Sequence, residues 1–266
     1  MTLEVLICTI DNGIQSIPHC LLPPREGISY LVSFQYTNES FRTIIPSTLL
    51  ERKDVHLCYL KGIGLSRNRN NALVHASGDI LLIADDDVCY KPEYFERIFM
   101  VFQQNPTVDV ACFQAIDKEG LPLHYYAAHR FAYSNQPYGV FFCSVEIAFR
   151  RKSILFHFDE RFGIGSPYLG GGEDEVFLLD AHKAGLNIVY FPFVIVETDA
   201  CTTGTRMLED RSILRAKGAV LYLMHGFISA WLRCLKFSLQ SHKKKNPLRL
   251  LYSMTAGIFY ILKTTR

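Results

Sequence analysis

Short apolar runs alternate with stretches of helical spacing along the first 116 residues. Continuous apolar runs are typical of buried strands, and apolar residues three or four positions apart are typical of helices. One helix is expected over Gly64–Gly78, with Ser66 as its N-cap, and another over Pro92–Asn105, with proline in its first turn. Because strands alternate with helices, the pattern predicts an α/β fold with a mostly parallel central sheet flanked by helices. The expected strands are Leu3–Ile10, Ile28–Tyr36, His56–Leu60, Ile80–Ala84 and Val108–Ile116.

The pattern is less regular in the rest of the chain. No linker-like composition interrupts residues 1–210, so we expect a single domain there, made of a half over 1–116 and a half over 117–210. A C-terminal helical region, 211–266, follows, with one long apolar helix expected over Arg211–Phe237. The other expected elements are strands at Val140–Arg151 and Asn187–Thr198 and a helix at Val176–Gly185.

Composition supports a folded cytoplasmic protein. The 266 residues are 49% hydrophobic, which suffices for one large domain. The N-terminus lacks the basic segment of a secretory signal. The 8 cysteines occur singly, which argues against a disulfide framework or a zinc site. The isolated histidines His124, His129 and His157 are expected to be core or surface residues.

Charge is distributed unevenly along the chain. Residues 211–266 contain 11 Lys/Arg and no Asp/Glu, whereas residues 1–210 carry a net charge of −9. The polybasic segment His242–Arg249 lies between apolar stretches too short to span a bilayer, which favours peripheral attachment to an anionic cytoplasmic membrane surface. In the alternative, these helices pack against the body and the lysines are solvated. Nucleic acid is not an expected partner, because the basic residues lie in an apolar tail.

Three consecutive carboxylates, Asp85–Asp87, follow the apolar run Ile80–Ala84. Ligands of open α/β sheets bind at the carboxyl ends of strands. Mg²⁺ and Mn²⁺ prefer carboxylate oxygens and bridge them to phosphates. The triplet therefore suggests a divalent cation with a bound diphosphate, although a solvated acidic turn is the alternative.

Two further motifs favour such a ligand. Arg67 and Arg69 lie near the start of an expected helix, where backbone amides and guanidinium groups suit a diphosphate, although a solvated basic turn remains the alternative. Downstream, three glycines precede Glu173, Asp174 and Glu175 at the start of a helix. Acidic residues are favoured there by the helix dipole alone, and a general base would need the same position.

Together these motifs resemble the family 2 glycosyltransferases of GT-A fold. The matching segments are GLSRNRNNALVHASGDILLIADDDV, FDERFG, GGEDEVF and a strand ending in Pro192, in family order over about residues 1–205. The resemblance implies a Rossmann-like nucleotide-binding half fused to an acceptor-binding half. It also implies a nucleoside-diphosphate sugar donor, an Mn²⁺ or Mg²⁺ cofactor and one inverting displacement.

The resemblance also assigns roles to single residues. It makes Asp87 the metal ligand, and it gives Asp86 and Asp85 the ribose and second-sphere positions. Arg69 and Asn70 would hold the nucleotide-sugar. Asp174 would be the catalytic base, and Glu173 would orient the acceptor hydroxyl.

Several family positions depart from the usual pattern. The first strand ends in CTIDN, where Thr9 is retained and Asp11 could serve the base-binding role. Gln35 stands where the second strand usually has an Asp that reads the nucleobase, yet UDP remains the expected carrier. Gly170 replaces an aromatic residue, so Tyr168 is a candidate acceptor platform. Glu197 and Asp199 are both candidates for a third metal ligand, and either could equally be a plain loop acid.

The expected function is transfer of a sugar from a nucleoside-diphosphate donor, most simply a UDP-sugar, to a hydroxyl of a glycan or lipid-linked acceptor, as in surface polysaccharide synthesis. One alternative is a sugar-nucleotide nucleotidyltransferase, although the loop DNGIQS lacks the basic residues that such enzymes place after the first strand. Another is a membrane-associated scaffold with a decayed GT-A-like fold.

Overall fold

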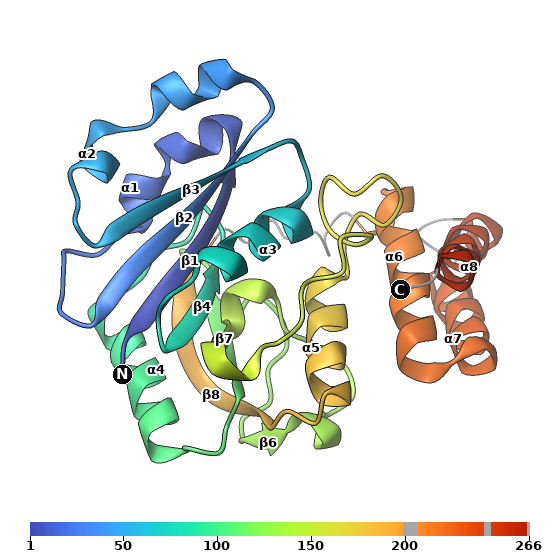
Figure 1. Ribbon diagram of the computed structural model, residues 1–266. Coiled ribbons are helices and arrows are strands. Elements are labelled where there is room, and N and C mark those ends of the chain that lie inside the picture. The colour runs from blue at the N-terminus through green and yellow to red at the C-terminus, as the bar shows by residue number, and fades with distance from the viewer. Residues whose placement is uncertain (199–206, 242–245, 265–266) are drawn as a thin grey trace. The chain divides into compact units, whose positions relative to one another are not determined.

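A single eight-stranded sheet organises the fold (Figure 1). The computed structural model describes residues 1–198, 207–241 and 246–264. Strand order across the sheet is β3-β2-β1-β4-β7-β5-β8-β6, and four of the seven pairings are parallel. The predicted α/β fold with a mostly parallel sheet is therefore confirmed. The strands are β1 (Leu3–Ile10), β2 (Ile28–Tyr36), β3 (Val55–Lys61), β4 (Ile80–Ala84), β5 (Val110–Ile116), β6 (Phe131–Ala132), β7 (Ile147–Arg150) and β8 (Ile188–Glu197).

Helices and short helical turns connect the strands. Helix α4 (Pro92–Gln104) has proline in its first turn, as expected, and α5 (Glu173–Lys183) begins with the acidic triplet. The C-terminal region contains α6 (Arg211–His225), α7 (Phe227–Gln240) and α8 (Pro247–Lys263). The remaining elements are η1 (Asp11–Gln15), α1 (Ile17–Cys20), η2 (Glu39–Ile44), α2 (Ser47–Leu50), α3 (Leu65–His75), η3 (Tyr133–Asn135), η4 (Ser144–Glu146) and η5 (Arg151–Ser153).

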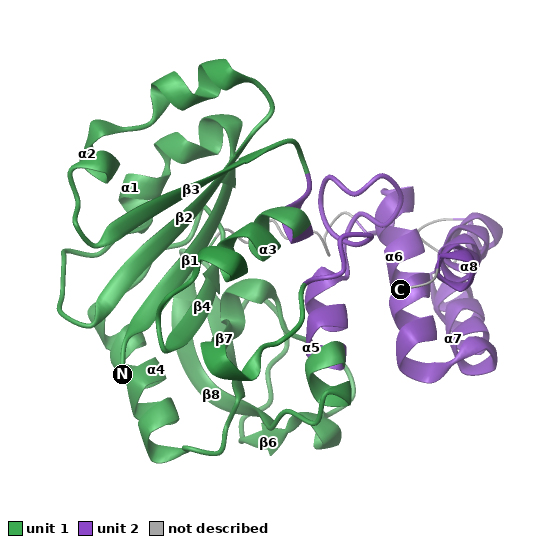
Figure 2. Cartoon of the chain, in the orientation of Figure 1, with its two compact units in different colours: residues 1–63, 67–157, 180–200 green, residues 64–66, 158–179, 201–266 purple. Residues whose placement is uncertain are grey.

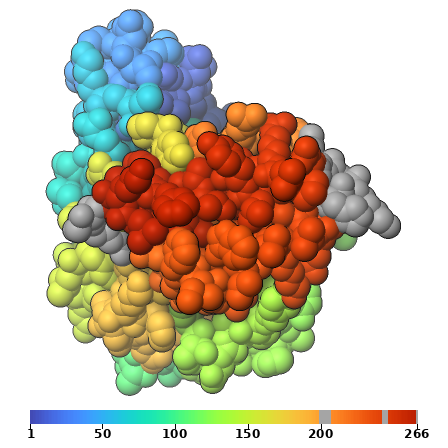
Figure 3. Space-filling view, turned by 90° about the vertical axis from the view of Figure 1, so that its right-hand side faces the viewer, coloured from blue at the N-terminus to red at the C-terminus, as the bar shows by residue number. Residues whose placement is uncertain are grey.

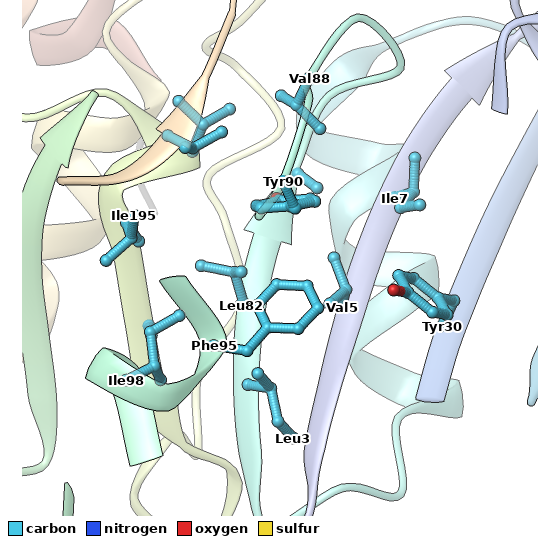
Figure 4. Packing of buried hydrophobic residues seen from close by; sticks show 14 of the residues in the cluster. Leu3, Val5, Ile7, Tyr30, Leu82, Val88, Tyr90, Phe95, Ile98 and Ile195 are labelled. Carbon is cyan, nitrogen blue, oxygen red and sulfur yellow. The ribbon is translucent and has the colours of Figure 1, made fainter. Parts of the chain in front are cut away.

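The main core lies between one face of the sheet and helix α4. Because side chains alternate along a strand, Leu3, Val5 and Ile7 of β1 point to the same face. On that face they join Phe95 and Ile98 of α4 in one buried cluster (Figure 4). Burial of large apolar side chains of this kind contributes roughly 1.5–3 kcal/mol each, so this face anchors the strands that carry the predicted site.

A buried asparagine connects the other face of the sheet to helix α3. The Nδ2 of Asn68 donates hydrogen bonds to the backbone oxygens of Thr9 and Ser33, both at 3.0 Å. The Ser33 hydroxyl donates in return to Asn68 Oδ1 at 2.7 Å. Asn68 is only 2% exposed, and since buried amides are stable only when hydrogen-bonded, these bonds fix α3 against β1 and β2.

The chain separates into two compact units (Figure 2). Unit 1 contains the described residues within 1–63, 67–157 and 180–200, and includes the whole sheet. Unit 2 contains those within 64–66, 158–179 and 201–266, and includes α6, α7 and α8. Helix α5 contributes its first residues to unit 2 and its last to unit 1.

Three local expectations were wrong. Ser66 is not an N-cap: it lies inside α3, which begins at Leu65, and its hydroxyl donates to the backbone oxygen of Phe162 at 2.7 Å. The strand expected over Val140–Arg151 is reduced to β7, because the turn η4 precedes it. The long helix over Arg211–Phe237 is broken at Gly226, whose φ of 73° is outside the helical region and favours glycine.

Two glycines allow α6 and α8 of unit 2 to approach closely. A Cβ on Gly218 of α6 would overlap the backbone oxygen of Met254, and a Cβ on Gly257 of α8 would overlap the backbone oxygen of Arg215. Each helix therefore presents a bare backbone to the other. Within the part of the chain that the structure describes, none of the helices combines the length and apolar character needed to cross a bilayer.

We predict that Gly218→Ala destabilises the protein, although alanine is the better helix former by about 1 kcal/mol. The overlap with the Met254 backbone must be relieved by moving α6 away from α8, at a cost of about 1–3 kcal/mol. Urea unfolding measures the change, with the exposed substitution Gln240→Ala in α7 as control. A Gly218→Ala protein as stable as wild type would contradict the close packing of these helices.

Candidate active site

Asp86, in the middle of the acidic triplet, is fixed by the loop that follows β1. Thr9 Oγ1 donates a hydrogen bond to Asp86 Oδ2 at 2.5 Å, and Ser16 Oγ donates to the backbone oxygen of Asp86 at 2.7 Å. A Cβ on Gly13 would overlap both Asp86 Oδ2 and Thr9 Oγ1, so only glycine allows the loop to approach this closely. Burial raises the pKa of the Asp86 carboxyl, an effect that the Thr9 hydrogen bond opposes.

Asp85 is paired with a buried arginine. Arg69 Nη2 lies 3.2 Å from Asp85 Oδ1 and donates to Ser144 Oγ at 2.6 Å. Arg69 is 3% exposed, whereas the side chain of Asp85 is 39% exposed. A buried guanidinium requires a partner charge, so this pair orients Arg69 at the end of β4. Asn70, the next residue of α3, is also buried.

Asp87 is exposed, and the chain beyond it pairs with the end of β8. The Cys89 amide donates to the Glu197 oxygen at 2.7 Å, and the Glu197 amide donates to the Cys89 oxygen at 3.0 Å. This bridge brings Thr198 next to the triplet, and its hydroxyl lies 3.4 Å from Asp87 Oδ1. The three carboxylates thus have distinct surroundings, and the outermost, Asp87, is accessible to solvent.

The residues expected at the nucleobase lie at the ends of β1 and β2. Both carboxylate oxygens of Asp11 accept hydrogen bonds from Thr37, from its amide at 2.7 Å and its hydroxyl at 2.8 Å. Asp11 has a φ of 49°. Gln35 is 2% exposed, and its Nε2 has no hydrogen-bond partner among the described residues. A buried amide without a partner is uncommon in proteins, so Gln35 has donor capacity for a ligand.

In unit 2 the acidic turn opens α5 against a glycine loop. Glu173 is 7% exposed, and a Cβ on Gly163 would lie 3.4 Å from its carboxyl group and 2.9 Å from Ser66 Oγ. Gly163 has a φ of 102°, which side chains rarely adopt. Burial raises the pKa of Glu175, and the charge of Glu173 raises it further. Asp174, between them, is partly exposed.

The amino-acid sequence was compared with curated proteins and with models of protein families. No curated protein matches the chain in sequence. Residues 37–158 match the sequence model of glycosyl transferase family 2, and they include the acidic triplet and Arg69. Over this segment the chain is similar to glycosyl transferase family 2. The resemblance stated from the sequence motifs is thereby confirmed.

Solved structures share the fold of this chain. Residues 1–349 of S. aureus TarS align with a TM-score of 0.63 at 13% identity, over 97% of this chain and 81% of that chain. The same fragment in complex with UDP aligns with a TM-score of 0.58 at 14% identity, over 100% of this chain and 76% of that chain. The complex of that fragment with UDP-GlcNAc aligns with a TM-score of 0.58 at 12% identity, over 92% of this chain and 74% of that chain. These similarities confirm the predicted GT-A fold.

The two candidates for a third metal ligand differ. Glu197 is engaged elsewhere: its Oε1 lies 2.5 Å from Lys91 Nζ and accepts a hydrogen bond from Tyr94 at 2.8 Å. Asp199 lies outside the described residues.

The candidate acceptor platform, Tyr168, is used in packing within unit 2, where its ring stacks on Tyr260 and the guanidinium of Arg215 lies 4.2 Å from its centroid.

Sequence reasoning missed several residues that hold the site together. Ser144, the partner of Arg69, was assigned to a strand, although the polar letters CSVE interrupt the apolar run there. Gly13 and Ser16 gave no signal, because their role depends on contact with a segment about 70 residues away. Asn68 lies within the recognised motif, yet only the structure shows that it binds the sheet and not a ligand.

A further polar cluster in unit 1 supports the turn at Ser144. The metal-binding atoms of His124, Cys143 and Glu146 lie within 4.8 Å of one another. Glu146 is fully buried, and its oxygens accept hydrogen bonds from Tyr126 and from the Cys143 amide. His124 Nε2 lies 2.9 Å from the same carboxylate. The cluster is therefore explained as a buried hydrogen-bond network that fixes η4.

We predict that Glu197→Gln destabilises the protein at neutral pH by about 1 kcal/mol. The ion pair with Lys91, and then the Tyr94 hydrogen bond, lower the pKa of Glu197. A carboxyl group whose pKa is lower in the folded than in the unfolded protein stabilises the fold at pH values above its unfolded pKa, which is about 4.3 for glutamate. This stabilisation is lost as the pH falls through the folded pKa. The difference from wild type should therefore vanish in acid.

Urea unfolding between pH 7 and pH 2.5 measures this dependence, with the exposed substitution Glu51→Gln as control. A Glu197→Gln effect of the same size at every pH would mean that the ion pair with Lys91 contributes nothing.

Proposed function

We propose that this chain is an inverting, metal-dependent glycosyltransferase that moves a sugar from a UDP-sugar to a hydroxyl of a glycan or lipid-linked acceptor. The observation that carries the proposal is that the three carboxylates at the end of β4 have different surroundings. Asp86 is bound to Thr9, Asp85 is bound to Arg69, and Asp87 faces solvent. Such an arrangement fixes two carboxylates for a nucleotide-sugar and leaves the third accessible to a cation.

The oxygen donors suit Mg²⁺ or Mn²⁺. Both ions favour carboxylates, and Mg²⁺ in particular is usually held by one or two of them together with substrate phosphates. Asp87 is exposed, so we assign the ion to Asp87. When bound, the metal would stabilise negative charge on the departing diphosphate. Glu197 is not included in the ligand set, because Lys91 and Tyr94 occupy its carboxylate.

Uridine as the nucleoside is supported by the ends of β1 and β2. TarS, which shares the fold, has been crystallised with UDP and with UDP-GlcNAc. The buried Gln35 amide has both a donor and an acceptor, which matches the acceptor and donor edge of uracil. We assign Gln35 to the base, with Thr9 and Asp11 positioning the loop beside it, and Arg69 and Asn70 to the nucleotide-sugar.

The chemical step requires a base at the acceptor. We assign it to Asp174, which removes the proton from the acceptor hydroxyl as that oxygen attacks the anomeric carbon and the bond to the diphosphate breaks. A single displacement from the opposite face inverts the anomeric configuration. Glu173 would orient the acceptor, because its buried carboxylate is held beside the Gly163 loop. Glu175 is less suited as the base, since burial favours its protonated form.

We predict that UDP raises the melting temperature by about 5 °C at saturation, and that GDP, CMP and ADP have smaller effects. The UDP effect should require Mn²⁺ and disappear in Asp87→Asn, since Asp87 would hold the ion that helps to bind the diphosphate. Thermal shifts with and without Mn²⁺ measure this, and Glu93→Gln, an exposed carboxylate in α4, serves as control. Absence of a metal-dependent shift with every nucleotide would overturn the proposal and favour a non-catalytic scaffold.

We also predict that Asp174→Asn lowers kcat by a factor of about 10²–10⁴ and leaves the UDP-induced thermal shift unchanged. Asparagine retains the shape of the side chain but cannot accept the proton. Release of UDP from a UDP-sugar in the presence of acceptor measures the rate, and Glu175→Gln in the same turn is the matched control. A variant with wild-type kcat would exclude Asp174 as the base.

A further inference from the structure

Helix α7 exposes several large apolar side chains to solvent and buries small ones in the helical bundle. The residues that face inward are Ala230, Cys234 and Ser238, each 1% exposed or less. Ile228, Leu232 and Leu239 face outward and are 77%, 54% and 56% exposed. They are spaced by four and seven residues, so they form one stripe along the helix. A helix of a soluble domain normally has the reverse arrangement.

Helix α8 repeats this feature next to α7. It buries Leu250, Met254 and Ile258 within the bundle, yet it also exposes an apolar face. Its exposed members are Leu248, Tyr252, Phe259 and Leu262, at 74%, 77%, 47% and 46%. The two helices pack against each other within unit 2 and lie side by side in the space-filling view, α7 in orange and α8 in red (Figure 3). The exposed rings of Phe227 in α7 and Phe259 in α8 join the two faces, with their centroids 6.0 Å apart. An exposed apolar surface of this extent marks an interaction site.

Positive charge adjoins this apolar surface. Arg233 and Lys236 of α7 are exposed beside the stripe. An open hollow of about 810 Å³ at the start of α7 has Phe227, Ile228 and Leu232 on its apolar side and His225, Arg233 and Lys236 among its polar residues. Apolar walls with adjacent cations match an amphiphile that has an acyl chain and an anionic head group.

We propose that the outward face of α7 and α8 binds the surface of an anionic lipid bilayer. Amphipathic helices lie in such interfaces with their apolar side buried among acyl chains and their basic residues at the head groups. Trp231, 39% exposed, and Tyr252 suit that depth, since each has an apolar body and a polar tip. A second copy of the chain fits less well, because residues 211–266 contain no Asp/Glu to pair with Arg233 and Lys236 across such an interface.

This attachment differs from the one predicted from the sequence. The polybasic segment named there has His242–Lys245 outside the described residues, and the present proposal does not rest on them. It rests on side chains whose exposure the structure gives. Membrane binding is also independent of glycosyl transfer, so the two proposals can fail separately.

The apolar contribution is tested with the full chain and two kinds of vesicle, phosphatidylcholine alone and phosphatidylcholine mixed with phosphatidylglycerol. Wild type should float with the anionic vesicles, and Ile228→Ser/Leu232→Ser should bind at least about tenfold more weakly. The matched control is Leu50→Ser/Leu121→Ser, which makes the same kind of change at two unit 1 positions that are each 61% exposed. The control should bind within about twofold of wild type.

The charge contribution is tested by Arg233→Glu/Lys236→Glu, which should reduce binding to anionic vesicles by at least about tenfold. Lys53→Glu/Lys152→Glu, at exposed positions of unit 1, is the control of equal charge. Binding of wild type should weaken in about 0.5 M NaCl, because salt screens the attraction to head groups. Thermal melts of all variants verify folding.

Three results would overturn the proposal. One is vesicle binding that both α7 variants retain. Another is equal binding to neutral and anionic vesicles. The third is a dimer in light scattering that Ile228→Ser/Leu232→Ser dissociates, without vesicle binding by wild type, since the face would then join two copies of the chain.

Discussion

Three adjacent carboxylates at the end of a buried strand repel one another, and the protein must compensate each charge locally. The surroundings of β4 answer this requirement in three ways. Asp86 is bound by the Thr9 hydroxyl, and Asp85 is paired with Arg69. Asp87 is exposed, so its charge is solvated. In the function proposed above, the same negative charge would attract the metal ion that accompanies a diphosphate.

This compensation dictates the structure for some distance around β4. Thr9 can reach Asp86 only if the loop after β1 approaches closely, which requires Gly13. Arg69 can be buried only if α3 is held against the sheet, which Asn68 does, and if a second acceptor is present, which Ser144 supplies. Ser144 in turn lies in a turn that the buried Glu146 fixes. The need to compensate negative charge at the end of β4 therefore explains why these polar residues are buried.

How much of this could be predicted from the sequence depended on the range of the interactions. The limits of β1, β2 and β4 agree with the expected strands to the residue, because a run of apolar residues suffices to identify a buried strand. Ser66 was misjudged as a cap because its partner, Phe162, is remote in sequence. The family motifs located Arg69 and the triplet, but only the fold shows that Arg69 is bound to Asp85 while Asp87 is accessible.

The same limit applies to the C-terminal helices. The sequence pattern of an apolar helix does not show whether its large side chains face inward or outward. In α7 the small residues Ala230 and Cys234 are buried. Small residues allow close packing, as Gly218 and Gly257 do between α6 and α8, so α7 can pack in the bundle without burying Ile228, Leu232 and Leu239. The charge asymmetry then acquires a physical meaning. An anionic surface attracts residues 211–266, which have no acidic side chain, and repels residues 1–210, with a net charge of −9. This distribution of charge supports the proposed contact of α7 and α8 with an anionic membrane surface.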